Sequence, residues 1–388
     1  MSASAKPANV LPLYLTGFAA FVGLYLPQPI LPLLADEFAV SPGDAGLIIS
    51  LTVLGIGLAA PFIGVLSDRF GRRRILVGAA SVLSLLMLGC AASGIFSGLL
   101  TLRFLQGVAL PGLFVVGLAY TAERLDAAAM RRAAGIYVAW TVIGGLAGRL
   151  LAGALTDFAS WRAGFLISSL FYATLVIVWW RQQDMPVAAG RDLRTTLNGT
   201  LSHLQNRALL GGLLIGFCLF LAFQSTFTYL PFKLTAAPYT LSATFTSLAY
   251  VSFVAGMVSS GLAGNIRARL GLRPSFVLGF ALAGLGNLFT LSAPLTVIAL
   301  GLLIVCFGNW LVQGLAVGFV ATATENDRAG ANALYQLFYY VGGSLGGYLP
   351  GLGYGQLGYG GAVGLSLLFI ALGFACTALL AQEDSSLG

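Results

Sequence analysis

The stretch Gly64-Val65-Leu66-Ser67-Asp68-Arg69-Phe70-Gly71-Arg72-Arg73-Arg74-Ile75-Leu76 sets four arginines and one aspartate between two long apolar segments. A polar stretch this short between two membrane-length helices predicts a tight hairpin. Its basic charge indicates that the hairpin lies in the cytoplasm, because lysine and arginine are enriched in cytoplasmic loops of membrane proteins. A merely basic loop needs neither the aspartate nor the two glycines, so the pattern carries more information than charge alone.

The composition indicates that lipid surrounds most of the chain. Charged residues make up 9% of the 388 residues and hydrophobic residues 58%, whereas soluble proteins are about 25% charged. The net charge of +7 does not indicate nucleic-acid binding, because the basic residues are scattered through short loops. The four cysteines lie far apart within apolar runs, so they predict neither a disulfide framework nor a metal site.

The hydrophobic runs predict twelve membrane spans, since a helix needs about 20 apolar residues to cross a bilayer. With both termini in the cytoplasm, Arg162 and Lys233 are the only basic residues in loops on the outer side of the membrane. Arg103 and Arg149 fall within spans, and the other basic residues are cytoplasmic. The predicted spans are 10–34, 45–66, 75–95, 97–121, 134–157, 163–180, 208–232, 241–264, 274–292, 295–321, 331–354 and 360–381.

The two halves of the chain repeat a glycine pattern. Gly144-Gly145-x-x-Gly148-x-x-x-x-Gly153 recurs 198 residues later as Gly342-Gly343-x-x-Gly346-x-x-x-x-Gly351. Glycines at this spacing clear one face of a helix for close packing. That face fits either a moving contact between the halves or static packing within one half. The repeat predicts an N-terminal six-helix bundle at 1–180, a cytoplasmic linker at 181–207 and a C-terminal six-helix bundle at 208–388.

Three motifs resemble those of the major facilitator superfamily. The run Gly-x-x-x-Asp-Arg-x-Gly-Arg-Arg-Arg resembles its signature loop between helices 2 and 3. Arg103, followed by Gln106 and Gly107, resembles its helix-four motif. Span five resembles the exporter-type glycine motif, although Arg149 stands close to the usual proline. The resemblance covers nearly the whole chain and implies an all-α membrane protein of twelve transmembrane helices in two pseudo-symmetric six-helix bundles.

The resemblance implies a secondary transporter of the drug- and sugar-exporter branch, run by proton antiport in the bacterial inner membrane. Its implied partners are a small-molecule substrate, protons and the lipid bilayer, and we expect a monomer without a cofactor. Two alternatives remain open: a facilitator or importer of small organic anions that uses Arg103 and Arg149 as an anion cradle, and a lipid flippase or non-transporting sensor. The sequence contains no ATP-binding loop and no nucleophile–base pair, so we do not expect an enzyme.

The resemblance also implies that spans one, four, seven and ten line a substrate cavity, which Tyr335 and Tyr339 of span eleven could join. A permanent cation in hydrocarbon costs several kcal/mol. Arg103 and Arg149 are therefore expected to face the bundle interior or a cavity, or else to clamp backbone carbonyls or an outer carboxylate. The candidate substrate-binding residues are Tyr25, Gln28, Arg103, Gln106, Arg149, Gln224, Phe227, Asn309, Trp310, Gln313 and Tyr335, with Phe220 and Tyr339 beside them.

The acidic residues predict where protons and gating contacts are handled. None of the 13 lies at the centre of a predicted span. The candidates for proton coupling are Asp36 and Glu37, at the end of span one, and Asp157, two turns beyond Arg149. The candidate gating residues are Gly64, Asp68, Arg69, Gly71, Arg72 and Arg328. By resemblance, Asp68 meets the N-terminus of span eleven, and Arg72 pairs with Glu123 or Asp126.

Overall fold

The computed structural model describes residues 10–184, 203–324 and 328–380. Within these ranges the chain is built from α-helices and short 3-10 segments. The first half contains α1 (Leu11–Tyr25), η1 (Gln28–Ile30), α2 (Leu31–Glu37), α3 (Pro42–Phe70), α4 (Arg72–Ala92), α5 (Phe96–Ala109), α6 (Pro111–Ala122), α7 (Ala127–Phe158) and α8 (Trp161–Trp180). The second contains η2 (His203–Gln205), α10 (Arg207–Thr235), α11 (Ala243–Ser247), η3 (Leu248–Ser252), α12 (Phe253–Leu270), α13 (Leu272–Thr290), α14 (Leu295–Val320), α15 (Arg328–Leu352), α16 (Tyr354–Cys376) and η4 (Thr377–Leu380).

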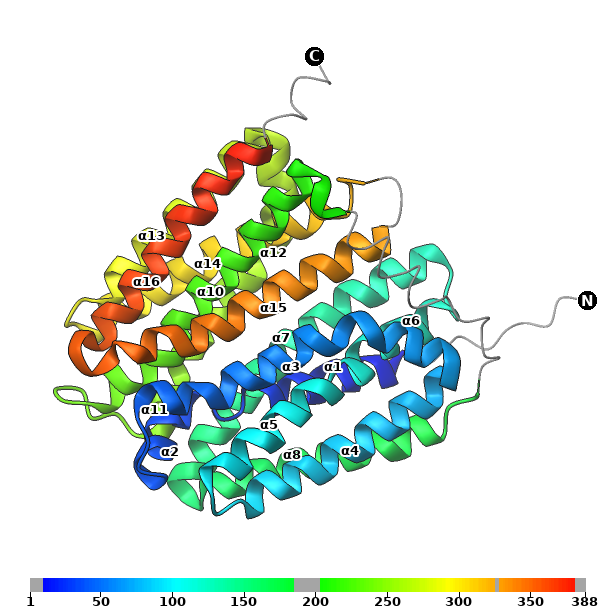
Figure 1. Cartoon of the computed structure of the whole chain (residues 1–388), viewed down its shortest axis with the longest axis horizontal. Coiled ribbons are helices and arrows are strands. Elements are labelled where there is room, and N and C mark those ends of the chain that lie inside the picture. Colours follow the sequence, from blue (N-terminus) through cyan, green and yellow to red (C-terminus); the bar gives the residue numbers. More distant parts are fainter. Residues whose placement is uncertain (1–9, 185–202, 325–327, 381–388) are drawn as a thin grey trace, which may run out of the picture.

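The helices form twelve segments of membrane length, as the hydrophobic runs predicted. In the described part of the chain, 11 of these segments are both long and apolar enough to cross a membrane. The remaining segment, α15, is the eleventh in chain order and packs between α10 and α3 (Figure 1). It has 25 residues and is therefore about 37 Å long at 1.5 Å per residue. Because protein rather than lipid covers much of it, α15 tolerates a more polar sequence.

The predicted hairpin at 64–76 is present and turns on one residue. Only Gly71 separates α3 from α4, and its φ is 92°. Gly271 separates α12 from α13 in the same way, with a φ of 85°. Residues with a side chain rarely adopt this left-handed region, whereas glycine does so readily. These two glycines therefore set corresponding turns in the two halves.

Three of the predicted spans are interrupted rather than continuous: the first, the fourth and the eighth, in which the 3-10 segment η3 lies between α11 and α12. The first breaks between α1 and α2, where Pro27, Pro29 and Pro32 stand within six residues. The fourth breaks at Pro111, which begins α6. Proline lacks the backbone N–H that a helix interior requires and clashes with the preceding turn. The first break places Gln28 in η1, which packs against α7, α10 and α11.

The helices form two groups with corresponding packing, seen as a blue-to-green and a green-to-red bundle in Figure 1. The pairs α1–α7, α3–α5 and α4–α8 correspond to α10–α15, α12–α14 and α13–α16. Between the groups, α3 packs against α15 and α7 packs against α11. This arrangement confirms the predicted fold class. The exact bundle limits at 1–180 and 208–388 remain a prediction, and most of the linker at 181–207 lies outside the described residues.

The repeated glycines serve both kinds of contact that the sequence left open. A Cβ atom on Gly148 would clash with the Val22 carbonyl of α1, in the same half, and one on Gly346 would clash with the Leu221 carbonyl of α10. The last glycine of each motif instead faces the other half: Gly153 meets α11, and Gly351 meets α3. The motif therefore packs each half internally and joins the halves at its final glycine.

The bundle has two chemically different ends. One, called the basic end below, carries the turns at Gly71 and Gly271 with their flanking arginines. The other, called the acidic end, carries Asp36, Glu37 and Asp157.

Candidate functional site

A central cavity of about 380 Å³ lies between the two halves. Helices α1 and α7 line it from one side, and α10, α12, α14 and α15 line it from the other. Ligand sites of small molecules commonly measure about 300–1,000 Å³, with apolar walls and few polar groups. Five predicted substrate-binding residues line the cavity, namely Tyr25, Arg149, Asn309, Trp310 and Gln313, together with Phe220 and Tyr339.

The cavity is more accessible from the basic end. Val138 and Val317, which line it toward that end, are 57% and 42% exposed, and Ser260 is exposed as well. Toward the acidic end, Arg149 is 1% exposed and Phe253 is 4% exposed. A solute in the cavity would therefore exchange with the basic side of the membrane.

Backbone contacts between glycines close the acidic end. Gly43 and Gly46 of α3 lie against Gly351 and Gly347 of α15, so closely that a Cβ atom on any of them would clash. Within the second half, the Tyr229 hydroxyl of α10 donates to the Gly347 carbonyl at 2.9 Å and so fixes α15 at this contact. Helices without side chains at the contact can approach closely, so this end is sealed by backbone.

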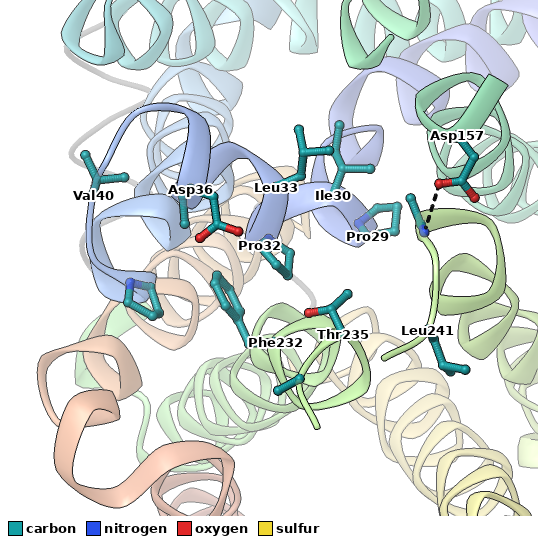
Figure 2. A pocket seen from close by; sticks show the side chains of 14 residues that line it. Pro29, Ile30, Pro32, Leu33, Asp36, Val40, Asp157, Phe232, Thr235 and Leu241 are labelled. Carbon is teal, nitrogen blue, oxygen red and sulfur yellow. Dashed lines mark hydrogen bonds between the residues drawn. The ribbon is translucent and has the colours of Figure 1, made fainter. Parts of the chain in front are cut away.

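Asp157 provides the polar link between the halves at the acidic end. It lies in the last turn of α7 and accepts hydrogen bonds from three groups at the start of α11. These are the Ser242 hydroxyl at 2.7 Å, the Ala243 N–H at 3.2 Å and the Thr244 N–H at 2.8 Å. Figure 2 draws the bond to Ala243. Unpaired N–H groups at a helix start favour a negative charge. Asp157 therefore holds α7 of one half to α11 of the other.

The other two predicted proton-coupling residues have different surroundings. Glu37 stays within the first half, where it pairs with Arg162 at 2.9 Å and accepts a hydrogen bond from the Trp161 indole at 2.5 Å. Asp36 lines a second pocket of about 540 Å³ at the acidic end. Asp36 and Asp157 lie on opposite sides of this pocket (Figure 2). Of the three predicted carboxylates, Asp157 is the one that contacts the other half.

Arg149 lies at the acidic-end side of the cavity among neutral groups. Its Nε donates to Gln28 Oε1 and its Nη1 to the Gly145 carbonyl, each at 2.8 Å. Its guanidinium carbon lies 4.1 Å from the ring centre of Tyr25, 4.8 Å from that of Tyr250 and 4.6 Å from that of Phe253. Cation–π contacts at these distances are attractive. Because Tyr25 belongs to one half and the other two rings to the other, Arg149 bridges them.

Arg103 does not line the cavity. It is fully buried and donates to the backbone carbonyls of Gly23 at 2.9 Å, Leu24 at 2.6 Å and Ile48 at 3.1 Å. It also donates to Gln106 Oε1 at 2.5 Å. These contacts hold α5 to α1 and α3, which is the clamp on backbone carbonyls that the sequence left as an alternative. Neither Arg103 nor Gln106 reaches the cavity in this conformation.

The remaining predicted substrate-binding residues lie behind the cavity wall. Gln28 is fully buried and orients Arg149. Phe227 packs against the rings of Tyr250 and Phe253. Tyr335 donates to Gln313 Oε1 at 3.0 Å. Gln224 is fully buried, and neither of its amide atoms has a hydrogen-bond partner among the described residues.

The predicted gating residues at the basic end make contacts within the first half. Arg72 pairs with Glu123, as expected, and with Asp68 at 3.2 Å, while Asp126 instead caps α7. Arg69 lies next to the Phe70 ring, 5.6 Å from its centre. A Cβ atom on Gly64 would meet nothing within 4 Å. The side chain of Arg328 lies outside the described residues, so the contact between Asp68 and span eleven stays a prediction.

Sequence reasoning missed the partners on the second half. Tyr250 and Phe253 face Arg149, and Ser242 begins the helix that Asp157 caps. Ser242 carried a usable signal, because serine before an apolar run is a typical helix N-cap. Tyr250 and Phe253 carried none, since aromatic residues in a membrane span are ordinary.

Comparison with known proteins agrees with this geometry. The family model described as Major Facilitator Superfamily matches residues 13–263. The chain is 30% identical to the uncharacterized MFS-type transporter YybF of Bacillus subtilis, over 95% of this chain and 92% of the relative. It is 29% identical to the inner membrane transport protein YnfM of Escherichia coli, over 93% and 88%. Among solved structures, a bacterial homologue of the human lysosomal transporter Spinster matches in fold, with a TM-score of 0.80 at 14% identity over 98% of both chains.

Proposed function

The chain belongs to the major facilitator superfamily, and we propose that it exports small organic solutes from the bacterial cytoplasm by alternating access, driven by the proton gradient. Its relatives are transporters, so the chain is a multi-pass membrane transporter rather than an enzyme. In this proposal the basic end faces the cytoplasm and the protein works as a monomer in the inner membrane.

The observation that carries the proposal is the asymmetry of the central cavity. It lies between two helix groups, is accessible from the basic end and is sealed at the acidic end by contacts between the halves. A channel would need both ends open at once. A carrier needs one closed end that opens when the other closes, and the solute crosses with that exchange.

The contacts at the two ends suit such an exchange. The acidic end is held by glycine backbone and by the hydrogen bonds of Asp157, all of which cross between halves. At the basic end, Gly64 leaves open space on α3. In the opposite state α15 would approach this face, and Asp68 would meet its N-terminus. Gly71 and Arg72 would hold Asp68 in position.

The proposed proton drive rests on Asp157. A protonated carboxyl accepts hydrogen bonds more weakly than a carboxylate, because charge-assisted bonds are roughly twice as strong as neutral ones. Protons on the acidic side would therefore loosen the link to α11 and favour the state that opens outward. Asp36 lies across the same pocket from Asp157.

Proteoliposomes with an imposed pH gradient test the proposal. A panel of cationic, neutral and anionic solutes is offered. We expect the flux of the solutes that the protein carries to rise with the gradient. The Asp157→Asn variant should weaken that dependence several-fold. The matched control is Asp44→Asn, since Asp44 accepts from Ser41 at the start of its own helix. Flux that ignores the pH gradient in the parent protein would rule out proton drive. If the protein moved fluorescent lipid and none of the soluble solutes, the result would favour a flippase.

A further inference from the structure

The lining of the central cavity contains one charge and no countercharge. Among the described residues that line it, Arg149 alone is charged, and none is acidic. The guanidinium is 1% exposed and takes part in no salt bridge with the described residues. The nearest acid along its own helix is Asp157, eight residues away and hence about 12 Å along the axis. Asp157 is already engaged with α11.

Neutral partners hold this cation without cancelling its charge. The two oxygen acceptors, Gln28 Oε1 and the Gly145 carbonyl, satisfy Nε and Nη1. Three aromatic faces lie within 5 Å of the guanidinium carbon. Such contacts offset part of the desolvation of the guanidinium and leave its net charge in place. An anionic ligand would interact with this charge in a poorly screened environment.

Gln28 adds a second donor beside the cation. Its side chain is fully buried and its Oε1 accepts from Arg149, yet its Nε2 has no hydrogen-bond partner among the described residues. Buried amide donors are nearly always paired. Around Arg149, with Gln28 just behind the cavity wall, donors therefore outnumber acceptors.

The rest of the cavity suits a flat apolar body. Phe220 and Tyr339 stack at 4.1 Å between ring centres, and Trp310 meets Phe223 edge-on at 5.1 Å. All four residues line the cavity. Aromatic walls pack well against planar or branched apolar groups. Asn309, next to Trp310 in α14, and Gln313, one turn further toward the basic end, add neutral polar groups.

We infer that the solute of this cavity is an organic monoanion, with an acid group against Arg149 and an aromatic or apolar body between the rings of the two halves. The inference rests on the proposed function only in taking the cavity as the solute site. It excludes organic cations, because an ammonium group would meet the buried guanidinium at close range with no acid to separate them.

Three compounds of the same shape test the inference: 3-phenylpropionate, its neutral amide, and the cation 3-phenylpropylamine. Binding is read in detergent as a shift of the thermal unfolding midpoint, since a ligand of the native state raises it. Transport is read by counterflow in proteoliposomes. We expect the acid to bind and to move about tenfold better than the amide, as one charge-assisted hydrogen bond permits. The amine should do neither.

The variants compare the acid with the amide within one protein preparation, so differences in folding cancel. Arg149→Gln should abolish the advantage of the acid, and Arg149→Lys should retain part of it. Arg181→Gln removes an exposed cation at the end of α8 and should change nothing. Equal handling of acid and amide in the parent, or an unchanged ratio in Arg149→Gln, would overturn the inference.

The two proposals fail in different ways. Transport of the amide or the amine as fast as the acid would leave the transport function standing and overturn the anion inference. Arg149-dependent binding of the acid without any counterflow would support the anion site and count against transport. Failure of all three compounds to bind or move would overturn the anion inference.

Discussion

Arg103 and Arg149 carry the same charge, and their contacts give them different roles. Arg103 donates to three carbonyls on α1 and α3 and never reaches the cavity, whereas Arg149 lines it. One arginine therefore holds helices together, and the other is the one that we propose offers its charge to a solute.

We predict that Arg103→Gln destabilises the protein far more than Arg149→Gln. The shorter side chain cannot reach all three carbonyls, and breaking a buried charged network costs about 3–5 kcal/mol. The measurement is the fraction of monodisperse protein left after heating in detergent. Arg103→Gln should lose its folded peak at a markedly lower temperature. Equal midpoints for the two variants would contradict the clamp.

The sequence could place both arginines inside the membrane but could not separate their roles. Hydrocarbon excludes an unpaired cation, so each had to face protein or water. Which of the two it faces depends on a small rotation of the helix about its axis, which moves the side chain by only a few ångströms. Asp157 was identified as an acid near Arg149, but its partners on α11 lie 85–87 residues away. That contact follows from how the halves dock, which no local pattern encodes.

Among the elements, the two glycine motifs divide their contacts by position. Gly346 packs α15 on α10 of the same half, and Gly351 packs α15 on α3 of the other half. A methyl group at the first position clashes in every state of the transporter. A methyl group at the second also meets the Tyr229 hydroxyl of α10, but its clash with the Gly43 backbone arises only while the acidic end is closed.

We predict that Gly346→Ala lowers stability, whereas Gly351→Ala opens the acidic end of an otherwise stable protein. The reporter is Thr246→Cys, at a fully buried position of α11, treated with a water-soluble maleimide. Gly351→Ala should raise its labelling several-fold, and Gly346→Ala should not do so at temperatures where it remains folded. Unchanged labelling in Gly351→Ala would show that the glycine contact does not control this gate.

Element boundaries were largely predictable because hydrophobic length and turn residues determine them. The hairpin at Gly71 followed from charge and glycine, and the twelve helices followed from apolar runs. The breaks near Pro27 and Pro111 were not predicted, because a proline in a membrane helix can either kink it or be accommodated. The first break matters for the site, since it carries Gln28 to Arg149.

Transport by alternating access requires that the two halves of the molecule separate at one end while the other end is closed. The repeat predicted two similar bundles, and the structure adds which end is closed. Sequence could not supply that, because one chain must encode both states with a small free-energy difference between them. The contacts that seal the acidic end include backbone at the glycines and the hydrogen bonds of one carboxylate.

Reversible cross-linking of the acidic end tests this most directly. Asp157→Cys and Ser242→Cys would be joined by a short bis-methanethiosulfonate reagent, in a background where the four native cysteines are alanine. The control pair is Ser84→Cys and Ser169→Cys, whose hydroxyl oxygens lie 3.0 Å apart within the first half. We predict that the first cross-link stops flux of a carried solute and that reductant restores it, while the control pair transports throughout. Undiminished flux with residues 157 and 242 joined would contradict alternating access through this gate.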